Sequence, residues 1–286
     1  MSIIQGGSMI EALQSAGVVM QPESRLIVVD PNDIANFSLQ DAIDEAVAGQ
    51  GDVIGTLPGG INVAAQVNMN KAGVRLMSLS LDTRNRIVNG EYHAIFSTTV
   101  VDAPVMKITA PCVIEGIGFA GSDAGALFFS GASLLIGGDA DANPFGVQIK
   151  GCRFPKWGLA ARIGIAVEGS SDVTVEECGF EGVGTALAIG VYVQGACQNI
   201  TVRNNVFRQV TAAISHGAFA GGGPHAMYHG NMVEDGIIFD SNGNTATGFI
   251  FDNWSELAPG SSYDDTIDNI KGFGMQISGN HYVEST

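Results

Sequence analysis

The chain is built on a short pattern of apolar and polar residues that returns several times. In each copy two apolar residues stand two positions apart, a small residue or an amide usually follows three positions later, and an aromatic residue closes the pattern after two more. Alternation with period two predicts a β-strand, and Gly, Asn or Cys after it predicts a tight corner before a second strand. The copies are Cys112–Phe119, Val147–Phe154, Val173–Phe180, Ile200–Phe207 and Met275–Tyr282.

The closing aromatic residues show the period of the repeat. Their successive separations are 35, 26, 27 and 75 residues, and the last divides into three intervals averaging 25. Self-similarity at this period predicts a stack of repeating units rather than one compact core. We therefore expect an all-β fold, a right-handed parallel β-helix, in which each coil contributes two strands and equivalent side chains stack about 4.8 Å apart.

Two stretches depart from the pattern. Residues 121–146 lengthen one interval and are predicted to be an insertion. Between residues 208 and 274 the pattern fades, which predicts a glycine-rich loop at 221–224, an imperfect coil at 237–239 and a second loop at 255–269. Loops that lengthen one coil often carry function.

One helix is predicted near the N-terminus, over residues 38–48. Ser38 is a good N-cap, and Asp41 complements the start of a helix. Gly49 and Gly51 end it. Its apolar face consists of Leu39, Ala42, Ile43, Ala46 and Val47. Such a helix would protect the exposed strand edge of the first coil.

Residues 1–36 do not share the repeating pattern. Within them, residues 9–16 are compatible with a short helix, and residues 25–30 predict a strand that Pro31 ends. We expect this segment to lie outside the repeating domain.

The residues that follow the predicted helix resemble a known family. A strand ends in Leu57-Pro58-Gly59-Gly60, and Gly73-Val74-Arg75-Leu76 then leads into the coils. This arrangement resembles pectate-lyase-like β-helix proteins, especially those of bacteriophage tail spikes, over residues 37–286. The resemblance implies a capping helix, a β-helix domain over residues 37–286, and a docking segment over residues 1–36.

A column of charged residues is predicted on the solvent side of the coils. The position after the second apolar residue holds Glu115, Lys150, Glu176, Arg203 and, later, Ser278. In neighbouring coils the charges would alternate in sign, and such cross-strand pairs stabilise a sheet by about 0.2–1 kcal/mol each. We therefore expect these ions to be structural rather than catalytic.

Composition narrows the class of partner. The formal net charge is −16, which argues against a nucleic-acid partner because phosphate binding needs a basic surface, and it disfavours anionic lipid. We expect neither secretion through a cleaved leader nor membrane anchoring, because the sequence shows neither a leader pattern nor an apolar span of 18 residues.

Four cysteines have two interpretations. Cys152 and Cys178 take the corner position that Asn205 and Asn280 hold in other coils, which predicts a ladder of small residues. A disulfide framework that also includes Cys112 and Cys197 is the weaker alternative.

Two short motifs could hold a metal ion. Asp139, Asp141 and Asn143 place oxygen groups at every second position, as a calcium loop does, but Pro144 and Lys150 stand where that motif needs Gly and Glu. A solvated acidic loop is the preferred interpretation.

His225 and His229 are four residues apart and would share one face of a helix, as zinc ligands do. The preceding glycines instead favour an exposed or partner-facing loop, so no metal or cofactor is expected.

Catalytic groups can be nominated but are not specified by a motif. The acidic pairs are Asp235 with Asp240 and Glu168 with Asp172, and the candidate bases of a lyase are Arg162, Arg203 and Arg208. An acidic chain produces such pairs by chance, and a glycosidase needs two carboxylates that face one groove.

The family resemblance does not supply the missing motif. Pectate lyases carry Arg-x-Pro-x-x-Arg, whereas this chain has Arg153-Phe154-Pro155-Lys156-Trp157-Gly158. Polygalacturonases carry Asn-Thr-Asp, Asp-Asp, His-Gly and Arg-Ile-Lys in that order. Here Asp264-Asp265 comes after both His-Gly pairs, at His216 and His229, and the other two elements are missing. Neither catalytic set transfers to this chain.

The sequence therefore favours a structural virion protein of a bacteriophage, made in the host cytoplasm: a short tail spike or fibre, or a capsid-decorating protein. We expect a homotrimer that meets other virion proteins through residues 1–36 or through a last coil without a cap, and that contacts host glycans. A polysaccharide lyase or glycoside hydrolase is the alternative. A carbohydrate-binding adhesin without turnover shares the same fold.

Overall fold

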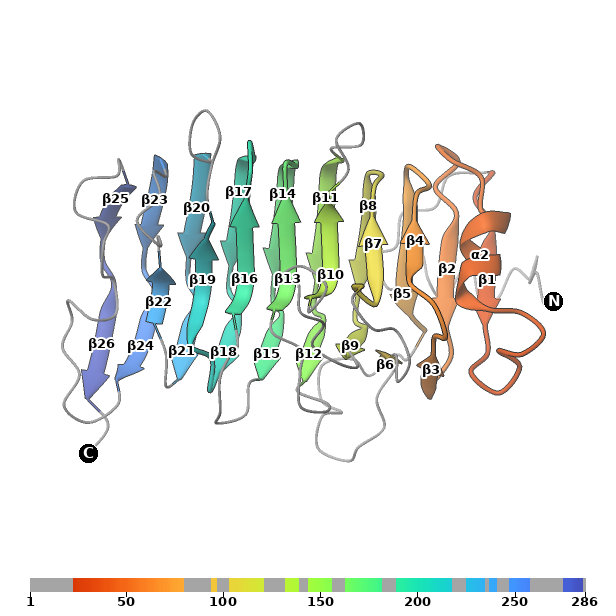
Figure 1. The fold of residues 1–286 in the computed structure, drawn as a ribbon, viewed down its shortest axis with the longest axis horizontal. Coiled ribbons are helices and arrows are strands. Elements are labelled where there is room, and N and C mark those ends of the chain that lie inside the picture. Colours follow the sequence, from red (N-terminus) through yellow and green to blue (C-terminus); the bar gives the residue numbers. More distant parts are fainter. Residues whose placement is uncertain are drawn as a thin grey trace.

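The computed structural model describes residues 23–79, 94–96, 103–120, 132–138, 144–155, 163–181, 189–217, 225–234, 237–240, 247–257 and 275–284. Within these ranges the chain winds through parallel strands from one helix, α2 (Leu39–Glu45), at the N-terminal end to the C-terminal coil at the other (Figure 1). The predicted parallel β-helix is confirmed. The strands form three sheets, which we name the first, second and third sheets in the order that the chain visits them within a coil.

The first sheet has ten strands. They are β1 (Leu26–Val29), β2 (Val53–Thr56), β5 (Val74–Ser78), β8 (Cys112–Glu115), β11 (Phe145–Lys150), β14 (Ser171–Glu176), β17 (Gln198–Arg203), β20 (His225–His229), β23 (Thr247–Phe251) and β25 (Met275–Ser278). The second sheet has nine strands. They are β3 (Gly60–Asn62), β6 (Ala94–Phe96), β9 (Gly118–Ala120), β12 (Arg153–Pro155), β15 (Gly179–Glu181), β18 (Val206–Arg208), β21 (Met232–Glu234), β24 (Trp254–Leu257) and β26 (His281–Glu284).

The third sheet corrects the prediction of two strands per coil. Its seven strands are β4 (Val67–Met69), β7 (Met106–Ile108), β10 (Ala132–Gly137), β13 (Ile163–Glu168), β16 (Ile189–Gln194), β19 (Ala212–His216) and β22 (Ile237–Asp240). Thus the predicted insertion at 121–146 contains a regular strand, β10. Every residue of β10 and β19 is buried, so these strands lack the alternation that marks a half-exposed strand.

The region in which the pattern fades holds two further coils of the first and second sheets. Strands β20 and β21 form one, and β23 and β24 form the next. Val233 and Ser255 occupy the positions of the closing aromatic residue, as their pairing along the second sheet shows, and this replacement hid the repeat. The predicted division of the long interval into three coils is confirmed. The predicted loops were wrong at residues 225–229, which form β20, and at residues 255–257, which lie in β24.

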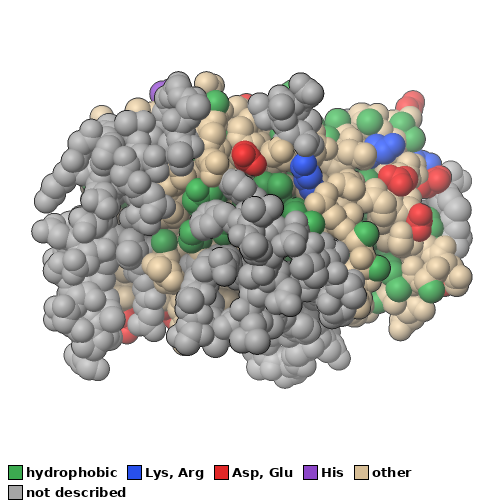
Figure 2. All heavy atoms as spheres, viewed as in Figure 1, with side chains coloured by type: hydrophobic (Ala, Val, Ile, Leu, Met, Phe, Trp, Pro, Cys, Tyr) green, Lys and Arg blue, Asp and Glu red, His purple; other side chains and the backbone are tan. Residues whose placement is uncertain are grey.

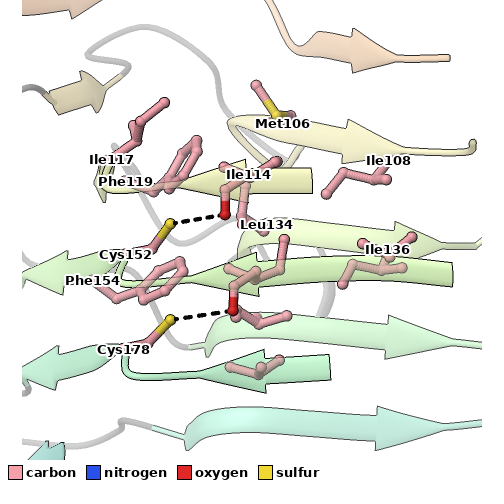
Figure 3. Close-up of a cluster of buried hydrophobic side chains, with 14 of the residues drawn as sticks. Met106, Ile108, Ile114, Ile117, Phe119, Leu134, Ile136, Cys152, Phe154 and Cys178 are labelled. Atoms are coloured by element: carbon pink, nitrogen blue, oxygen red, sulfur yellow. Dashed lines mark hydrogen bonds between the residues drawn. The ribbon is translucent and has the colours of Figure 1, made fainter. Parts of the chain in front are cut away.

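Aromatic residues stack inside the solenoid, as the spacing predicted. The ring centroids of Phe119 and Phe154 are 5.9 Å apart, and those of Phe154 and Phe180, and of Phe180 and Phe207, are each 4.7 Å apart. The rings are within 20° of parallel. Those of Phe119 and Phe154 lie beside aliphatic side chains of the same core, such as Ile114 (Figure 3). One continuous apolar core therefore runs along the axis.

The corner between the first and second sheets carries the predicted ladder of small residues. Buried Asn205, Asn231 and Asn253 each donate from Nδ2 to Oδ1 of the asparagine in the next coil, over 2.9–3.0 Å, and the series ends at Asn280. In earlier coils the thiols of Cys152 and Cys178 contact backbone carbonyls instead. All four cysteines are free and buried, so the disulfide alternative is wrong.

The N-terminal helix is confirmed, although it is shorter than predicted. Ser38 and Asp41 form a capping box, and α2 packs against β1 and β4. The backbone leaves the helix at Ala46, so Val47 is 40% exposed instead of lying on the buried face. Among the described residues there is no helical segment with the length and hydropathy that crossing a bilayer requires.

The predicted strand at 25–30 is β1, and it pairs with β2 in the first sheet. Asp52, which is fully buried, fixes it there. Its carboxylate accepts hydrogen bonds from the guanidinium and the backbone N–H of Arg25 and from the N–H of Val47. Acidic and basic side chains lie intermixed at this end of the molecule (Figure 2). The predicted helix at 9–16 lies outside the described residues.

Candidate functional site

The outer faces of the first and third sheets differ in accessibility. On the third sheet the outward side chains Leu135, Ala166 and Tyr192 belong to a second buried apolar cluster. On the first sheet most outward side chains of the central and C-terminal coils are polar or aromatic, and most of them reach solvent. The outer face of the first sheet is therefore the candidate site.

Alternation along each strand places the side chains of this face. In β20 and β23, Tyr228 and Ile250 point into the core and are fully buried, so their neighbours on either side point outward. Register then aligns the outward residues of successive coils in columns. The middle column is Gln148, Thr174, Thr201, Met227, Phe249 and Gln276, and the next is Glu115, Lys150, Glu176, Arg203, His229, Phe251 and Ser278.

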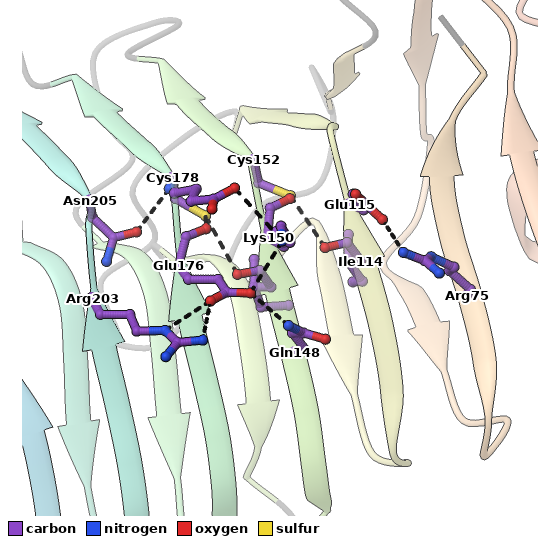
Figure 4. A network of polar contacts seen from close by, with 12 residues as sticks. Arg75, Ile114, Glu115, Gln148, Lys150, Cys152, Glu176, Cys178, Arg203 and Asn205 are labelled. Carbon is purple, nitrogen blue, oxygen red and sulfur yellow. Dashed lines mark hydrogen bonds and ion pairs between the residues drawn. The ribbon is translucent and has the colours of Figure 1, made fainter. Parts of the chain in front are cut away.

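Glu176 is the centre of a polar network on this face (Figure 4). Its Oε2 accepts hydrogen bonds from Nε and Nη2 of Arg203 at 2.9 and 2.6 Å. On the other side its Oε1 accepts from Nε2 of Gln148 at 2.7 Å and lies 3.7 Å from Nζ of Lys150. The predicted alternation of charge along this column is therefore confirmed for these coils.

The network also fixes the protonation state of Glu176. Burial by itself raises the pKa of this carboxyl, but the hydrogen bonds from Arg203 and Gln148 and the charges of Arg203 and Lys150 outweigh burial, so the pKa is lowered. A lowered pKa keeps Glu176 ionised at neutral pH, which does not suit a general acid.

Other carboxylates on the described strands of this face are also engaged. Glu115 forms an ion pair with Nη2 of Arg75, and Asp172 accepts a hydrogen bond from Nδ2 of Asn199 at 2.9 Å. The proposed pair of Glu168 with Asp172 is split between two sheets, because Glu168 ends β13 of the third sheet.

Several nominated groups take other places. Arg208 pairs with Glu234 on the second sheet, with 3.0 Å between Nε and Oε2. Arg162, Asp235 and the calcium-like residues Asp139, Asp141 and Asn143 lie outside the described residues, as does the side chain of Asp240. Within the described part of the chain, no cluster of three or more His, Cys, Asp or Glu side chains is arranged to hold a metal.

The two histidines of the zinc-like motif lie on a strand, which corrects both the helix and the loop hypotheses. Four residues of extended chain separate His225 from His229 by roughly 13 Å, too far to share one ion. His225 Nδ1 lies 3.1 Å from Oγ1 of Thr247, while the ring of His229 stacks on Phe251 with 4.7 Å between centroids and 5° between planes.

His229 also has a shifted protonation equilibrium. Partial burial, followed by the charge of Arg203 on the adjacent strand, lowers its pKa, and Asp252 opposes this effect. The imidazole of His229 is therefore uncharged at neutral pH.

His216, the other histidine of a His-Gly pair, is enclosed in the core. Its Nε2 is hydrogen bonded to the hydroxyl of Tyr228, and the two rings meet edge to face with 5.6 Å between centroids. Because the side chain is fully buried, His216 has no access to a polysaccharide.

Sequence reasoning missed the aromatic patch on this face. Met227 and Phe249 are 40% and 46% exposed on adjacent strands. The signal was present, because Ala226, Tyr228 and Ile250 alternate with these residues at period two. It was obscured because two exposed apolar residues appear where a half-buried strand normally has polar ones.

The family assignment follows from a match to a family model, and it agrees with the fold. A model of the family described as "Right handed beta helix region" matches residues 112–285, more than half of the chain. The chain therefore belongs to the right-handed β-helix family. A search of curated protein sequences finds no significant match.

Solved structures show the same architecture at low sequence identity. The catalytic domain of a GH87 α-1,3-glucanase, solved with nigerose, is 11% identical with a TM-score of 0.59, over 93% of this chain and 46% of that chain. This chain thus spans about half of the glucanase domain, and the likeness shows the fold alone.

Two further structures align more loosely. A mannuronic-acid-specific family 6 lyase from human gut microbiota is 10% identical with a TM-score of 0.49, over 91% of this chain and 77% of that chain. ORF18 of Geobacillus virus E2 is 13% identical with a TM-score of 0.38, over 100% of this chain and 65% of that chain.

Proposed function

We propose that this protein is a structural β-helix protein of a bacteriophage particle that holds a cell-surface polysaccharide on its first sheet without cleaving it. A short tail spike or fibre, or a capsid-decorating protein, fits this role. The virion assignment is supported by the resemblance of residues 37–286 to tail spikes. The non-cleaving assignment is supported by the outer face of the first sheet.

The state of the carboxylates carries the non-cleaving assignment. Glycosidases use one carboxylic acid that protonates the leaving oxygen and a second carboxylate that acts as base or nucleophile. On the described strands of the first sheet, Glu115, Asp172 and Glu176 are each hydrogen bonded or ion-paired to a neighbouring side chain. A carboxylate that is already hydrogen bonded or ion-paired to a neighbouring side chain suits a structural ladder better than acid catalysis.

Assembly is part of the same proposal. We propose a homotrimer that attaches to other virion proteins through residues 1–36, as the resemblance to tail spikes implies. The sequence is acidic, with a net charge of −16, which supports neither nucleic acid nor anionic membrane as a partner.

The test combines binding, turnover and mass. The purified chain is mixed with bacterial capsular and lipopolysaccharide glycans, and bound sugar and released reducing ends are measured alongside the mass in solution. We expect binding of at least one glycan, no release, and a mass three times 29.6 kDa. Release of sugar that is lost in Asp172→Asn would overturn the non-cleaving role, and a monomer would overturn the trimer.

One observation favours a polysaccharide lyase as the second candidate. His229, whose lowered pKa suits a base, is the register neighbour of the cation Arg203. A lyase removes a proton next to a carboxylate whose charge is neutralised. This candidate predicts ultraviolet-absorbing unsaturated uronate products from the wild type and none from His229→Ala.

A further inference from the structure

Four outward side chains on adjacent strands of the first sheet form a flat surface, which we name the β20–β23 patch. It consists of Met227 and His229 from β20 and Phe249 and Phe251 from β23. Register pairs Met227 with Phe249 and His229 with Phe251. Adjacent strands are about 4.8 Å apart, and outward neighbours on one strand are about 7 Å apart, so the four side chains mark the corners of a small rectangle.

One edge of the patch is already a stacked pair of rings. The planes of His229 and Phe251 are within 5° of parallel, and their centroids are 4.7 Å apart. Stacking restrains both rings, so a ligand that packs against them loses little additional side-chain entropy.

The other edge of the patch is the exposed one. The side chains of Met227 and Phe249 are 40% and 46% accessible, although each is large and apolar. Single exposed apolar residues are ordinary, but a contiguous group surrounded by polar residues marks an interaction surface.

Polar groups surround the patch on both sides along the sheet. Thr201 and Arg203 precede it on β17, and the exposed Gln276 and Ser278 follow it on β25. Along the strands, the hydrogen-bonded pair of His225 and Thr247 borders its start. An apolar floor with hydroxyl, amide and imidazole groups at its rim matches the two faces of a sugar ring, which present C–H groups and hydroxyls.

Charge around the patch selects the kind of sugar. Arg203 is already held by two hydrogen bonds to Glu176, and the exposed Asp252 directly follows β23. The chain as a whole is also acidic, with a net charge of −16. An anionic sugar would meet repulsion here without a spare cation among the described residues of these strands to bind it, and a nucleic acid, whose bases also stack on rings, is disfavoured by its phosphates.

We propose that the β20–β23 patch is a binding subsite for an uncharged hexose residue of a polysaccharide. The C–H face of the sugar ring packs on Phe249 and Phe251, and its hydroxyls meet the side chains of His225, Thr247 and Gln276 at the rim. This subsite rests on the proposed glycan-binding function and specifies the ligand that this function takes.

The test compares matched oligosaccharides and matched variants by titration calorimetry. The probes are neutral gluco-, manno- and galacto-oligosaccharides and the corresponding oligouronates. The variants are Phe249→Ala and Phe251→Ala. The control is Phe145→Ala, which removes a ring that is 65% exposed at the start of β11 in the same sheet, outside the patch.

A neutral oligosaccharide is expected to bind the wild type, with affinity reduced about tenfold in each patch variant and unchanged in Phe145→Ala. Far-ultraviolet circular dichroism of the variants confirms that the solenoid is intact.

Other outcomes separate the two proposals. Preferential binding of an oligouronate, or neutral binding that neither patch variant weakens, overturns the subsite while the glycan-binding function stands. Absence of binding to any glycan overturns both. A fall in solution mass in Phe249→Ala would assign the patch to an interface between copies of the chain and overturn the subsite.

Discussion

Arg203 donates two hydrogen bonds, from Nε and Nη2, to the same oxygen of Glu176 on the preceding coil. The other oxygen of that carboxylate accepts from Gln148 on the coil before. One side chain thus joins three successive coils on the outer face of the first sheet. Because the carboxylate is nearly buried, replacement of Glu176 removes the acceptor that donors on both neighbouring strands share.

Glu176→Ala is expected to lower the free energy of unfolding by about 2–3 kcal/mol, since a largely buried charged acceptor with several donors is removed. Glu176→Gln, which keeps one acceptor oxygen, should cost less. The measurement is urea denaturation. The control is Glu234→Ala, which breaks the exposed pair with Arg208 and should cost about 0–1 kcal/mol. Equal losses at the two sites would refute the three-coil role.

The asparagine ladder predicts a larger effect in the core. Oδ1 of Asn231 accepts from the backbone N–H and from Nδ2 of Asn205, and its Nδ2 donates to the carbonyl of Val202 and to Asn253. Asn231→Ala leaves these buried groups unpaired and should cost about 3 kcal/mol or more.

Asn68→Ala is the control for the ladder. Asn68 is exposed, and within the described residues its Oδ1 accepts one hydrogen bond, from Nε2 of Gln66. It should change the free energy of unfolding by less than about 1 kcal/mol. Thermal denaturation at fixed pH compares the two variants, and a small loss in Asn231→Ala would mean that water replaces the ladder.

Stability should fall on acidification because of His216. Burial lowers the pKa of this imidazole to about 3, against an ordinary value of 6.5. Between these values the unfolded chain binds a proton that the folded chain does not, so stability decreases as pH falls from 6.5 toward 3. The loss is roughly 3 kcal/mol by pH 4.

His216→Gln isolates the contribution of His216 to this pH dependence, because the carboxylates titrate in the variant and in the wild type alike. The stability of the variant should decline less than that of the wild type between pH 6.5 and pH 4. Denaturation curves at several pH values give the difference. Parallel declines in the two proteins would show that His216 takes up a proton without unfolding.

Close packing between sheets predicts the effect of a single methyl group. A Cβ at Gly190 of β16 would lie against the ring of Phe207 and 2.7 Å from the carbonyl oxygen of Ala213. Gly190→Ala should therefore destabilise by about 2 kcal/mol or more, by overpacking.

Gly146→Ala is the comparison for Gly190, since a Cβ there meets nothing within 4 Å and adds only the strain of φ +73°. That strain costs about 1 kcal/mol. Chemical denaturation ranks the two variants, and a milder effect at Gly190 would show that the phenyl ladder can shift.

Much of the candidate face was predictable from local pattern. The alternation of Val173 and Val175 identified the inner and outer sides of β14, and the same position in each coil supplied the column that contains Glu176 and Arg203. The aromatic patch was not predicted, because Phe249 follows a glycine and the usual closing aromatic is replaced by Ser255 in that coil.

The sequence by itself determined the repeat, the parallel stacking of Phe154, Phe180 and Phe207, and the capping helix, since each depends on residues close together in the chain or on a constant period. Only the tertiary structure decided that seven strands form a third sheet and that Met227, His229, Phe249 and Phe251 share one surface. Third-sheet strands such as β10 are buried on both sides, so they show no alternation. The patch joins residues about 22 positions apart, so the alternation within each strand does not reveal that the two strands are neighbours.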